Sequence, residues 1–428
     1  MRAAFYTLGC KVNQNETGAL EEMFRSAGFT VVPAEEAADI FVVNSCTVTA
    51  AGDAKSRRAL SRARTANPDV ITVLTGCSPQ AFPGGAAKAG ADIVTGTAQR
   101  SRLLDNIRLF MKTKTPVVDI SPLGKDQRFE ELPAAPMPGR TRAFVKVQDG
   151  CNRKCAYCII PTARGPARSR AEESVLEELR LLAGKGYAEV VFTGINLSSY
   201  GQGTGTDLAA LANAAAEIPG IQRIRLSSME PDHITEDMAA RFAAQKKLCP
   251  HFHLSLQSGC KATLGRMRRP YTPESYAAVA ATLRRLLPTA SLTTDVIVGF
   301  PGESEEEFAE SLAFVEKMEF LKVHVFPFSA RAGTAAAGFP GQLPKAEKSR
   351  RSTLMQKAAD AVRAAWIARQ KGTRHTVLLE TPLPDGNFTG YTENYIPVAV
   401  AAPVAAQGDI VTVELGNFDG ERCACVLL

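Results

Sequence analysis

The sequence predicts an α/β protein of three parts, which are a doubly wound parallel sheet, an open six-unit β/α barrel and a small antiparallel β-barrel. Short apolar strands alternate with helical segments over residues 1–110 and again over 143–330, as in βαβ units. Residues 111–142 hold five prolines and few periodic apolar positions, which indicates a linker. Beyond residue 371 the helical period gives way to short strands separated by Asp-Gly turn pairs.

Length and composition narrow the class of protein. A chain of 428 residues exceeds one ordinary core and predicts two or three domains. A mean hydropathy of -0.07 is typical of a soluble globular protein, and no apolar run reaches the roughly 18 residues that span a bilayer. The amino terminus lacks the apolar core of a signal peptide. We therefore expect a cytoplasmic protein without a membrane partner, whose ten cysteines are metal ligands or ordinary thiols.

Four apolar segments of the amino-terminal part have the length of buried strands, and a helical period follows the first of them. The strands are expected at Ala3–Leu8, Asp39–Asn44, Val70–Thr75 and Asp92–Thr95, and the helix at Glu16–Ala27. Cys10, Cys46 and Cys77 follow the first three strands. Ligands of doubly wound sheets bind beyond the carboxyl ends of the strands, so these thiols can converge on one metal cluster. Three unrelated buried cysteines are the alternative.

The barrel is predicted from six further strands with helical segments between them. The strands are expected at Ala143–Gln148, Glu189–Thr193, Ile224–Ser227, His251–Leu256, Thr293–Val298 and Lys322–Phe326. The helices are expected at Glu172–Leu182, Thr206–Ala216, Pro273–Leu287 and Glu305–Met318. The chemistry of such barrels lies at the carboxyl ends of the strands. Unusual segments collect there, namely the cysteine loop 151–158, Gly194-Ile-Asn196, Ser227-Ser-Met-Glu-Pro231, Gln257-Ser-Gly259 and Gly299-Phe-Pro-Gly-Glu303.

The cysteine loop, CNRKCAYC, has the spacing C-x3-C-x2-C. Cys151, Cys155 and Cys158 are close enough on one loop to converge on one metal centre. A structural zinc site takes four ligands, and no histidine or fourth cysteine lies nearby. A 4Fe-4S cluster held by three thiolates keeps one iron open for another ligand. An incidental group of cysteines or an incomplete zinc knuckle is the alternative.

A polar face is predicted on the strand HFHLSLQ. Because side chains alternate along a strand, His251, His253, Ser255 and Gln257 share one face. An unpaired buried polar group costs roughly 1–3 kcal/mol, so this face requires partners. A bound polar cofactor would supply them, and a hydrogen-bonded network with water is the alternative.

The carboxy-terminal part begins with a basic helix over residues 345–371, whose apolar stripe is expected at Leu354, Ala358, Val362 and Trp366. Four strands are then expected at His375–Glu380, Asn387–Thr392, Ile396–Ala401 and Asp409–Leu415. They predict a closed antiparallel barrel. Cys423 and Cys425 lie in its last strand, and we interpret them as packing residues because no further ligand lies near them.

Basic residues are concentrated in three blocks, at residues 55–64, 140–170 and 345–374. Such blocks suit a polyanion such as RNA, with solvated helix faces as the alternative. Residues 371–428 hold three Lys/Arg against seven Asp/Glu, a net charge of −4 that is unusual for an RNA-binding module. We therefore expect the preceding basic helix to make the electrostatic contact, through Lys348, Arg350, Arg351 and Arg363.

Taken together, these motifs resemble the radical S-adenosylmethionine (radical SAM) methylthiotransferases along nearly the whole chain. TLGCKVNQNET, VVNSCTVTA and LTGCSP resemble the amino-terminal domain of that family. CNRKCAYCIIPTARGPARSR, LSSMEP, HLSLQSGC and DVIVGFPGE resemble its catalytic barrel. The last segment resembles a TRAM domain, an OB-like barrel. The resemblance implies a methylthiotransferase domain over 1–114, a linker over 115–139, a radical SAM domain over 140–370 and a TRAM domain over 371–428.

The same resemblance implies two 4Fe-4S clusters and SAM as cofactors. Cys151, Cys155 and Cys158 would hold the radical SAM cluster, and Cys10, Cys46 and Cys77 an auxiliary cluster. Tyr157 would lie near the adenine of SAM. The other implied SAM contacts are at strand ends, namely Gly194, Asn196, Glu230, Ser255, Gln257, Asp295 and Gly299. One SAM would methylate a sulfur on the auxiliary cluster, and another would yield the 5′-deoxyadenosyl radical that activates the substrate C–H bond.

For the substrate, VHVFPFSARAGTAAAGFPGQ and the short TLGCKVNQNET segment resemble the branch of the family that modifies C2 of threonylcarbamoyladenosine 37 in tRNA. A sulfur donor and a reducing electron donor would be further partners. Isopentenyladenosine in tRNA and an aspartate of a ribosomal protein are the alternative substrates of the family. A non-enzymatic alternative is an RNA-binding iron–sulfur redox sensor.

Overall fold

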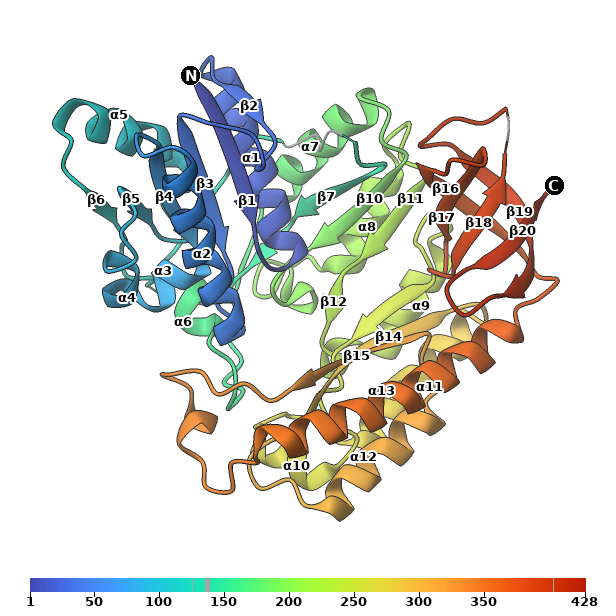
Figure 1. Ribbon diagram of the computed structural model, residues 1–428. Coiled ribbons are helices and arrows are strands. Elements are labelled where there is room, and N and C mark those ends of the chain that lie inside the picture. The colour runs from blue at the N-terminus through green and yellow to red at the C-terminus, as the bar shows by residue number, and fades with distance from the viewer. Residues whose placement is uncertain (125, 135–138, 403) are drawn as a thin grey trace.

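The computed structural model describes residues 1–124, 126–134, 139–402 and 404–428. A parallel sheet (blue to teal), an open barrel (green to orange) and a closed β-barrel (red) follow one another in space as in the sequence (Figure 1). Positions 125 and 135–138 of the expected linker lie outside the described residues. Within the described ranges, no helix combines the length and the apolar character needed to cross a membrane.

The first sheet has six parallel strands in the order β2-β1-β3-β4-β5-β6. Its strands are β1 (Arg2–Thr7), β2 (Thr30–Val32), β3 (Ile40–Ser45), β4 (Ile71–Gly76), β5 (Ile93–Thr95) and β6 (Val117–Asp119). Its helices are α1 (Lys11–Ser26), α2 (Ala50–Ala66), α3 (Cys77–Ala81), α4 (Pro83–Ala87) and α5 (Leu103–Thr113) after the 3-10 turn η1 (Arg100–Arg102).

Two apolar cores confirm the doubly wound arrangement. Leu20 of α1 and Ile107 of α5 pack with Val42 on one face, and Leu60 of α2 packs with Val43 on the other. The sequence did not predict the edge strands β2 and β6, which have three residues each and no clear alternation. β6 lies within the segment expected to be a linker and pairs with β5.

The barrel strands are joined in parallel pairs, in the order β7-β10-β11 and β12-β13-β14-β15. They are β7 (Arg142–Lys146), β10 (Glu189–Thr193), β11 (Arg223–Leu226), β12 (Ser228–Met229), β13 (His251–Leu254), β14 (Ser291–Val298) and β15 (Lys322–Pro327). β11 and β12 flank Ser227, so one expected strand is interrupted there. Among the described residues β7 and β15 do not pair with each other, and the barrel is open as predicted.

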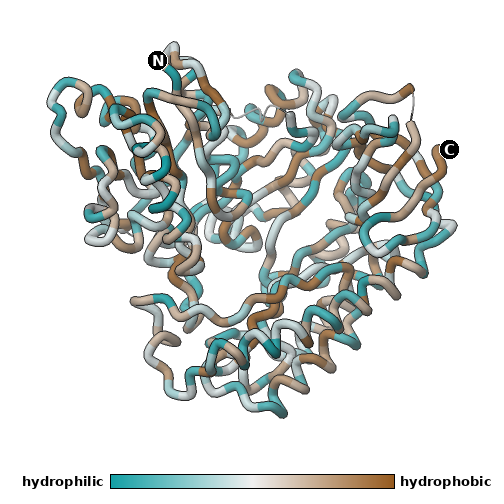
Figure 2. The backbone as a smooth tube through the Cα atoms, in the orientation of Figure 1, coloured by the Kyte–Doolittle hydropathy of each residue, from teal (hydrophilic) through white to brown (hydrophobic). Residues whose placement is uncertain are grey.

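Helices cover the outside of this barrel. They are α7 (Glu172–Gly184), α8 (Leu208–Ala216), α9 (Glu236–Ala244), α11 (Pro273–Leu286) and α12 (Glu305–Lys317), of which α9 was not predicted. Shorter elements are α6 (Ile160–Arg164), α10 (Lys261–Arg266), the pair β8 (Gln148–Asp149) and β9 (Arg168–Ser169), and the 3-10 turns η2 (Leu197–Ser199), η3 (Pro231–His233) and η4 (Ala335–Gly338). Figure 2 shows hydrophobic stretches along the barrel strands and mixed colouring along the covering helices.

The long helix α13 (Lys345–Ala368) corrects the predicted apolar stripe. Leu354 is 39% exposed, whereas the buried positions are Arg351, Met355, Ala359, Trp366 and Ile367. An alanine-rich helix offers neighbouring stripes of similar apolar character. Packing on β15 and α12 selects the stripe one residue further along.

The carboxy-terminal part is the predicted small β-barrel, closed by five strands in the order β16-β17-β18-β20-β19. Its strand pairs are antiparallel as predicted, except that β18 and β20 pair in parallel. Its strands are β16 (Arg374–Pro382), β17 (Asn387–Thr392), β18 (Pro397–Ala401), β19 (Ile410–Phe418) and β20 (Cys423–Leu427). Cys423 is buried in the barrel core and Cys425 packs against it, in agreement with a packing role. Trp366 of α13 and Leu321 of the central barrel belong to the same apolar core, so the two barrels pack against each other through it.

Candidate active site

The first cysteine set lies at one edge of the six-stranded sheet. Cys10 caps α1 after β1, Cys46 follows β3, and Cys77 begins α3 after β4. These three strands are neighbours, and the strand order reverses between β1 and β3. The crevice outside the carboxyl ends of the strands at such a reversal is the usual ligand site of doubly wound sheets. The structure thus brings together three cysteines that are far apart in the sequence.

Two Gly-Cys pairs require their glycines. Gly9 has φ +110°, and a Cβ on it would lie 2.9 Å from Cβ and 3.1 Å from Sγ of Cys46. Gly76, which precedes Cys77, has φ +98°, and a Cβ there would lie 2.7 Å from the carbonyl oxygen of Ser45. Both backbones adopt left-handed conformations that disfavour other residues. The glycines therefore allow the Cys10 and Cys77 loops to close around Cys46.

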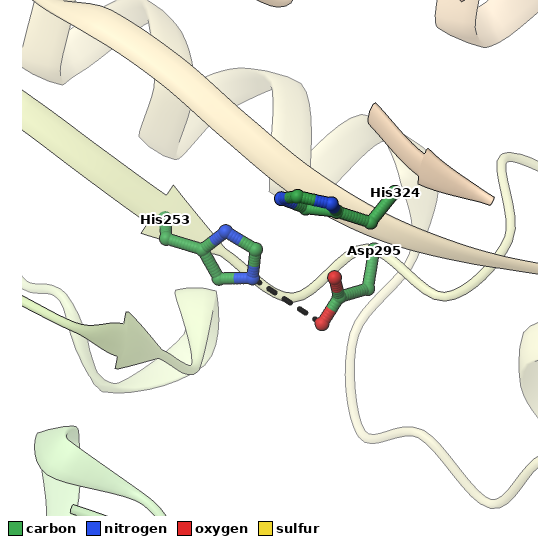
Figure 3. Close-up of side chains that lie close together, drawn as sticks. All are labelled: His253, Asp295 and His324. Carbon is green, nitrogen blue, oxygen red and sulfur yellow. Dashed lines mark hydrogen bonds and ion pairs between the residues drawn. The ribbon is translucent and has the colours of Figure 1, made fainter. Parts of the chain in front are cut away.

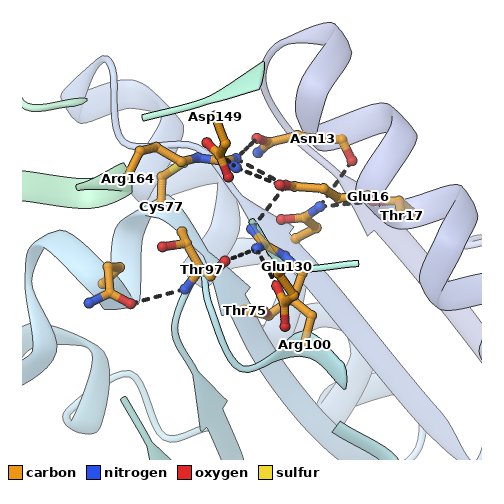
Figure 4. Close-up of polar contacts among 12 residues, drawn as sticks. Asn13, Glu16, Thr17, Thr75, Cys77, Thr97, Arg100, Glu130, Asp149 and Arg164 are labelled. Atoms are coloured by element: carbon orange, nitrogen blue, oxygen red, sulfur yellow. Dashed lines mark hydrogen bonds and ion pairs between the residues drawn. The ribbon is translucent and has the colours of Figure 1, made fainter. Parts of the chain in front are cut away.

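A buried polar network joins this edge of the sheet to the cysteine loop of the barrel (Figure 4). Arg164, which ends α6 directly after the loop, donates from Nε to Sγ of Cys77 at 3.2 Å. Arg164 also pairs with Glu16 of α1, which accepts from Lys146 of β7 at 2.8 Å. Arg100 pairs with the same carboxylate at 2.9 Å. One glutamate thus holds three cations from both parts of the chain.

The electrostatics of Glu16 follow from this arrangement. Burial alone raises the pKa of its carboxyl group, but Arg100, Arg164 and Lys146 outweigh burial and lower the pKa to about 2. Asp149 lies in the same network, and its pKa is lowered by Lys146, Arg164 and Arg168 against the effect of burial. Both carboxylates are therefore ionised, and the network stabilises the contact between sheet and barrel only as a complete set.

The second cysteine set lies on the loop that follows β8. Arg269 donates from Nη1 to Sγ of Cys155 at 3.2 Å and pairs with the carboxylate of Glu230. Its Nε donates to Oη of Tyr271 at 2.9 Å. Each cysteine set therefore has one sulfur that accepts a hydrogen bond from a buried arginine.

The donor chemistry of both sets fits iron–sulfur clusters better than a mononuclear site. A tetrahedral zinc site with bonds of about 2.3 Å brings its sulfur ligands within about 4 Å of one another. Among the described residues, three ligand atoms lie within 4.8 Å of one another at His253, Asp295 and His324, and in neither cysteine set. Burial raises the pKa of Cys77 to about 11 and that of Cys158 to about 12, so metal loading must displace their protons.

The predicted SAM contacts lie around the barrel strand ends. The ring of Tyr157 meets Phe300 edge-on at 6.5 Å. Gly299 has φ +70°, and a Cβ there would lie 2.6 Å from Cγ of Lys348. Asn196 is buried, and its Oδ1 has no hydrogen-bond partner among the described residues. An unpaired buried acceptor of this kind fits a donor such as the amino group of SAM.

Three further residues that were predicted to contact SAM form bonds with other parts of the protein. Glu230 is bound by Arg269. The backbone NH of Ser255, a buried residue, donates to the carbonyl of Met229 at 3.0 Å. Gln257 has φ +67° and bridges the carbonyl of Asp295 and the NH of Ile297 through its backbone, at 2.8 Å each.

A cavity of about 760 Å³ lies where the three parts of the chain meet. The amino-terminal part contributes Gly9, Cys10, Lys11 and Val12. The barrel contributes strand-end residues that include Thr193, Gly194, Ser227, His251, His253, Asp295 and His324. The closed barrel contributes Tyr391, Tyr395, Pro397, Glu421 and Arg422. Of the predicted site residues Cys10, Gly194 and Asp295 line this cavity, whereas the other five ligand cysteines are not among its lining residues.

His253, Asp295 and His324 lie together on three adjacent strands of the cavity wall (Figure 3). Nε2 of His253 lies 3.3 Å from Oδ2 of Asp295, and its Nδ1 lies 3.0 Å from Oγ1 of Thr293. Two imidazoles and a carboxylate form a donor set that also suits a divalent metal ion. Because both ring nitrogens of His253 already have protein partners, the group as it stands is a polar wall for a hydrogen-bonding ligand. The predicted polar face is thus confirmed for His251 and His253, which line the cavity. Ser255 and Gln257 lie beyond the end of β13, and the left-handed backbone of Gln257 breaks the alternation on which their prediction depended.

The structure contradicts part of the predicted RNA contact on α13. Arg351 is 4% exposed and pairs with Glu303 at 2.7 Å, so it cannot reach a phosphate. Arg350 pairs with Glu347 at 2.7 Å. Nζ of Lys348 donates to the carbonyl of Phe328 at 3.2 Å, and Arg363 donates to the carbonyl of Glu421 at 3.2 Å. The prediction counted charges without their partners, which come from segments distant in the sequence.

Arg164 and Arg269 are site residues that the sequence analysis did not single out. Arg164 lies in PTARGPARSR, directly after the cysteine loop, and Arg269 lies in LGRMRRPY, far along the chain. Sequence alone does not say which of several arginines contacts a sulfur. Arg168 and Arg170 are also buried, but they pair with Asp149 and Glu178.

An open parallel barrel that carries a three-cysteine loop after its first strands defines the class of radical SAM enzymes. Residues 145–315 match the Radical SAM superfamily. Residues 2–96 match the family described as Uncharacterized protein family UPF0004. A 4Fe-4S cluster and SAM are the cofactors that this superfamily implies.

Relatives of known name define the family more closely. A Bacillus subtilis (strain 168) protein named threonylcarbamoyladenosine tRNA methylthiotransferase MtaB is 38% identical, covering 96% of this chain and 93% of that protein. A protein of the same name from Aquifex aeolicus (strain VF5) is 38% identical, covering 93% and 96%. A tRNA-2-methylthio-N(6)-dimethylallyladenosine synthase from Pelotomaculum thermopropionicum is 34% identical, covering 90% and 88%. The chain belongs to the radical SAM methylthiotransferase family.

Solved structures support the fold. The radical SAM methyltransferase TsrM from Kitasatospora setae superimposes with a TM-score of 0.54 at 14% identity, over 76% of this chain and 74% of that chain. The cobalamin-dependent radical SAM enzyme OxsB superimposes with a TM-score of 0.51 at 13% identity, over 83% and 56%. At this level of identity the two likenesses show a shared fold. Membership in this enzyme family favours catalysis over the sensor alternative.

Proposed function

We propose that the protein transfers a methylthio group to C2 of threonylcarbamoyladenosine at position 37 of tRNA. The MtaB-named relatives at 38% identity support this substrate. The observation that carries the proposal is the shared cavity, because Cys10 of the first cysteine set and Gly194 and Asp295 of the barrel line it together. A substrate in this cavity would lie beside Cys10 and beside two of the proposed SAM contacts, Gly194 and Asp295.

In this proposal each cysteine set holds a 4Fe-4S cluster. Cys151, Cys155 and Cys158 would hold the radical SAM cluster, and Cys10, Cys46 and Cys77 the auxiliary cluster. When bound, these clusters and SAM supply the methyl group, the sulfur and the radical that removes a hydrogen atom from the substrate carbon. A reducing electron donor and a sulfur donor act as partners, and the site of action is the cytoplasm.

The protein's own groups bind and orient these reactants. Asn196 offers its unpaired Oδ1 to the amino group of SAM. Tyr157, held against Phe300, borders the adenine. Arg269 fixes the carboxylate of Glu230 and the sulfur of Cys155 in one position. The proposed SAM contacts also include Gly194, Ser255, Gln257, Asp295 and Gly299, and the proposed domain boundaries are 1–114, 115–139, 140–370 and 371–428.

The character of the cavity favours threonylcarbamoyladenosine over dimethylallyladenosine. A dimethylallyl group is apolar and is best bound by apolar side chains. Beside apolar residues such as Leu321 and Phe326, the cavity presents a charged and polar group of side chains, namely Lys11, His253, Asp295, Lys322 and His324. A threonylcarbamoyl group carries a carboxylate, a hydroxyl and a urea-like linkage, which suit such a wall.

Mass spectrometry of tRNA nucleosides tests the proposal directly. Cells that lack the gene should lose 2-methylthio-threonylcarbamoyladenosine and accumulate the unthiolated nucleoside. The purified, cluster-loaded protein should restore the product on that tRNA with SAM and a reductant. If these cells lost the methylthio form of dimethylallyladenosine instead, or lost only the modification of a ribosomal-protein aspartate, the substrate would be another one of the family.

The two cysteine sets have different roles in this proposal, and this difference gives a second test. The triple variant Cys10→Ala, Cys46→Ala, Cys77→Ala should still form 5′-deoxyadenosine but no methylthio product. The triple variant Cys151→Ala, Cys155→Ala, Cys158→Ala should form neither. The proposal is wrong if the first variant still inserts sulfur, as measured by nucleoside mass spectrometry.

A further inference from the structure

Lys11 brings into the cavity a positive charge that forms no ion pair with any residue the structure describes. It is the first residue of α1, it is half-buried, and it lines the cavity next to Cys10. Within the part of the chain that the structure describes, its ammonium group has no carboxylate partner and donates no hydrogen bond. Arg142 and Arg225 lie over the ring of Tyr395, another residue that lines the cavity.

The neighbouring cations are balanced. Arg142 pairs with Glu380 at 2.6 Å. Arg225 pairs with Glu189 at 2.8 Å, and Arg223 pairs with the same carboxylate at 3.3 Å. Glu189 and Glu380 are thus paired with arginines, and among the described residues Lys11 has no carboxylate partner. A bound anion would remove the cost of keeping it unpaired.

The same cavity contains two buried polar atoms without partners. Nδ1 of His251 and Oγ of Ser227 make no hydrogen bond with any described residue, although both residues are only 5% exposed. Both line the cavity. Buried polar atoms normally find partners, so their presence at a cavity wall indicates a polar ligand.

The closed barrel contributes two stacked tyrosines to the cavity wall near Lys11. Tyr395 stacks on His251 with ring centroids 4.4 Å apart and on Tyr391 at 4.5 Å. It has φ +73°, a left-handed conformation that is costly for an aromatic residue and often marks a functional site. Arg225 lies over its ring at 4.8 Å. The turn between β17 and β18 therefore positions an aromatic wall beside Lys11.

The chemistry of the substrate matches this arrangement. In threonylcarbamoyladenosine the threonylcarbamoyl group is attached to N6. The ring atoms on either side of N1 are C2 and C6, and C6 bears N6. A carboxylate that binds at Lys11 therefore keeps C2 on the same edge of the base. Because Lys11 directly follows Cys10, that edge would face the auxiliary cysteine set.

We propose that Lys11 binds the carboxylate of the substrate's threonyl group, and that His251 Nδ1 and Ser227 Oγ add polar contacts. This carboxylate subsite rests on the proposed function and deepens it, because it makes the amino-terminal domain the part that selects the modified adenosine. A dimethylallyl group cannot compensate the charge, so it is disfavoured at this site.

An anticodon stem–loop RNA that bears threonylcarbamoyladenosine tests the subsite, compared with the same RNA whose threonyl carboxylate is a neutral methyl ester. Binding to the cluster-loaded protein is measured by fluorescence anisotropy at fixed salt. The wild-type protein should bind the acid about tenfold more tightly than the ester. Lys11→Met should bind both equally, and Lys11→Arg should keep a preference for the acid.

Controls separate folding and catalysis from recognition. Lys112→Met, at an exposed lysine of α5, should keep the wild-type preference. Iron content and the melting temperature report whether Lys11→Met is folded, and Lys11→Gln replaces it if it is not. Equal wild-type binding of acid and ester, or a preference that persists in Lys11→Met, overturns the subsite. Absence of any methylthio product with wild-type protein overturns the proposed function instead.

Discussion

Arg164 and Arg269 perform the same task at the two cysteine sets. Each is buried, and each donates one hydrogen bond to a cysteine sulfur, at 3.2 Å in both cases. Each also binds a carboxylate, Glu16 or Glu230, which fixes the guanidinium plane. Hydrogen bonds to cluster sulfurs are among the factors that set the potential of an iron–sulfur centre. The arginines are therefore positioning residues for the sulfur ligands.

Arg269→Met should make the midpoint potential of the radical SAM cluster more negative. The substitution removes a positive charge and a hydrogen bond that stabilise the more negative, reduced state. A contact of about 1.4 kcal/mol corresponds to roughly 60 mV for a one-electron couple. Spectroscopic redox titration measures the shift. Arg268→Met, at the exposed neighbouring arginine, is the matched control, and an unchanged potential in Arg269→Met would contradict this role.

At the scale of elements, α1 is the piece that joins the amino-terminal sheet to the barrel. Nδ2 of Asn15 donates to the carbonyl of Phe144 in β7 at 2.6 Å, and Glu16 binds Lys146 of the same strand. Nδ2 of Asn13 donates to the carbonyl of Leu8 at 2.8 Å. The polar face of this helix is therefore buried. The helix was predicted to begin at Glu16, whereas it begins five residues earlier at Lys11, because KVNQN shows no apolar period.

Glu16→Gln should destabilise the protein in a pH-dependent way. The pKa of Glu16 is lowered from 4.5 to about 2 in the folded protein, so its contribution is present above pH 4.5 and is lost as the pH falls towards 2. The shift corresponds to about 3 kcal/mol at neutral pH. Denaturant unfolding should show the full difference from wild type at pH 7 and a smaller one near pH 3.

Glu22→Gln is the control for Glu16→Gln. It lies on the same helix, is half-exposed and pairs with Arg25 at 3.5 Å. Its effect should stay below about 1 kcal/mol, as for other exposed ion pairs. Equal effects of the two substitutions would show that the buried network does not hold the parts together.

The turn that carries Tyr395 depends on Arg225 of β11. Arg225 donates to the carbonyl of Glu393 at 3.0 Å and to that of Thr392 at 3.3 Å. Arg225→Met leaves Glu189 partly uncompensated and should cost about 3 kcal/mol. Calorimetry should then resolve a separate, earlier transition of the closed barrel. Arg241→Met breaks a partly exposed pair with Asp207 at 2.6 Å and should leave one transition, as in the wild type.

For the whole molecule, α2 presents more exposed basic side chains without a carboxylate partner than α13 does, within the described ranges. Lys55, Arg57, Arg58 and Arg62 are exposed and, within the described ranges, have no carboxylate partner. α2 follows Cys46 directly, so it lies beside the proposed auxiliary cluster. Its charges remain available to phosphates, whereas Arg350 and Arg351 of α13 are paired with carboxylates. We therefore expect α2 to make the electrostatic contact with tRNA.

The double variant Arg58→Glu, Arg62→Glu should weaken tRNA binding and flatten its salt dependence. Each lost phosphate contact lowers the slope of log K against log salt by about 0.7 to 0.9. Filter binding over a salt series measures both quantities. Arg350→Glu on α13 should change the slope little because Arg350 is already paired. A larger effect of Arg350→Glu would restore the first prediction.

Much of the fold was predictable because local patterns specify it. Parallel strands such as Glu189–Thr193 were predicted with their observed bounds, since continuous apolar runs mark buried strands. Short edge strands such as Val117–Asp119 were missed because three residues are too few to show a period. The stripe on α13 was misplaced at Leu354 because alanine-rich helices have several equivalent faces.

The sequence by itself determined the two cysteine sets, the order of the three parts and the family, because these depend on residue identity and spacing along the chain. Tertiary structure decided which charges are free. It paired Arg351 with Glu303 and buried Arg164 against Cys77, and it left Lys11 in the cavity without a partner among the described residues. Pairing depends on distances between segments far apart in the sequence, and a count of charges along the chain contains no such distance.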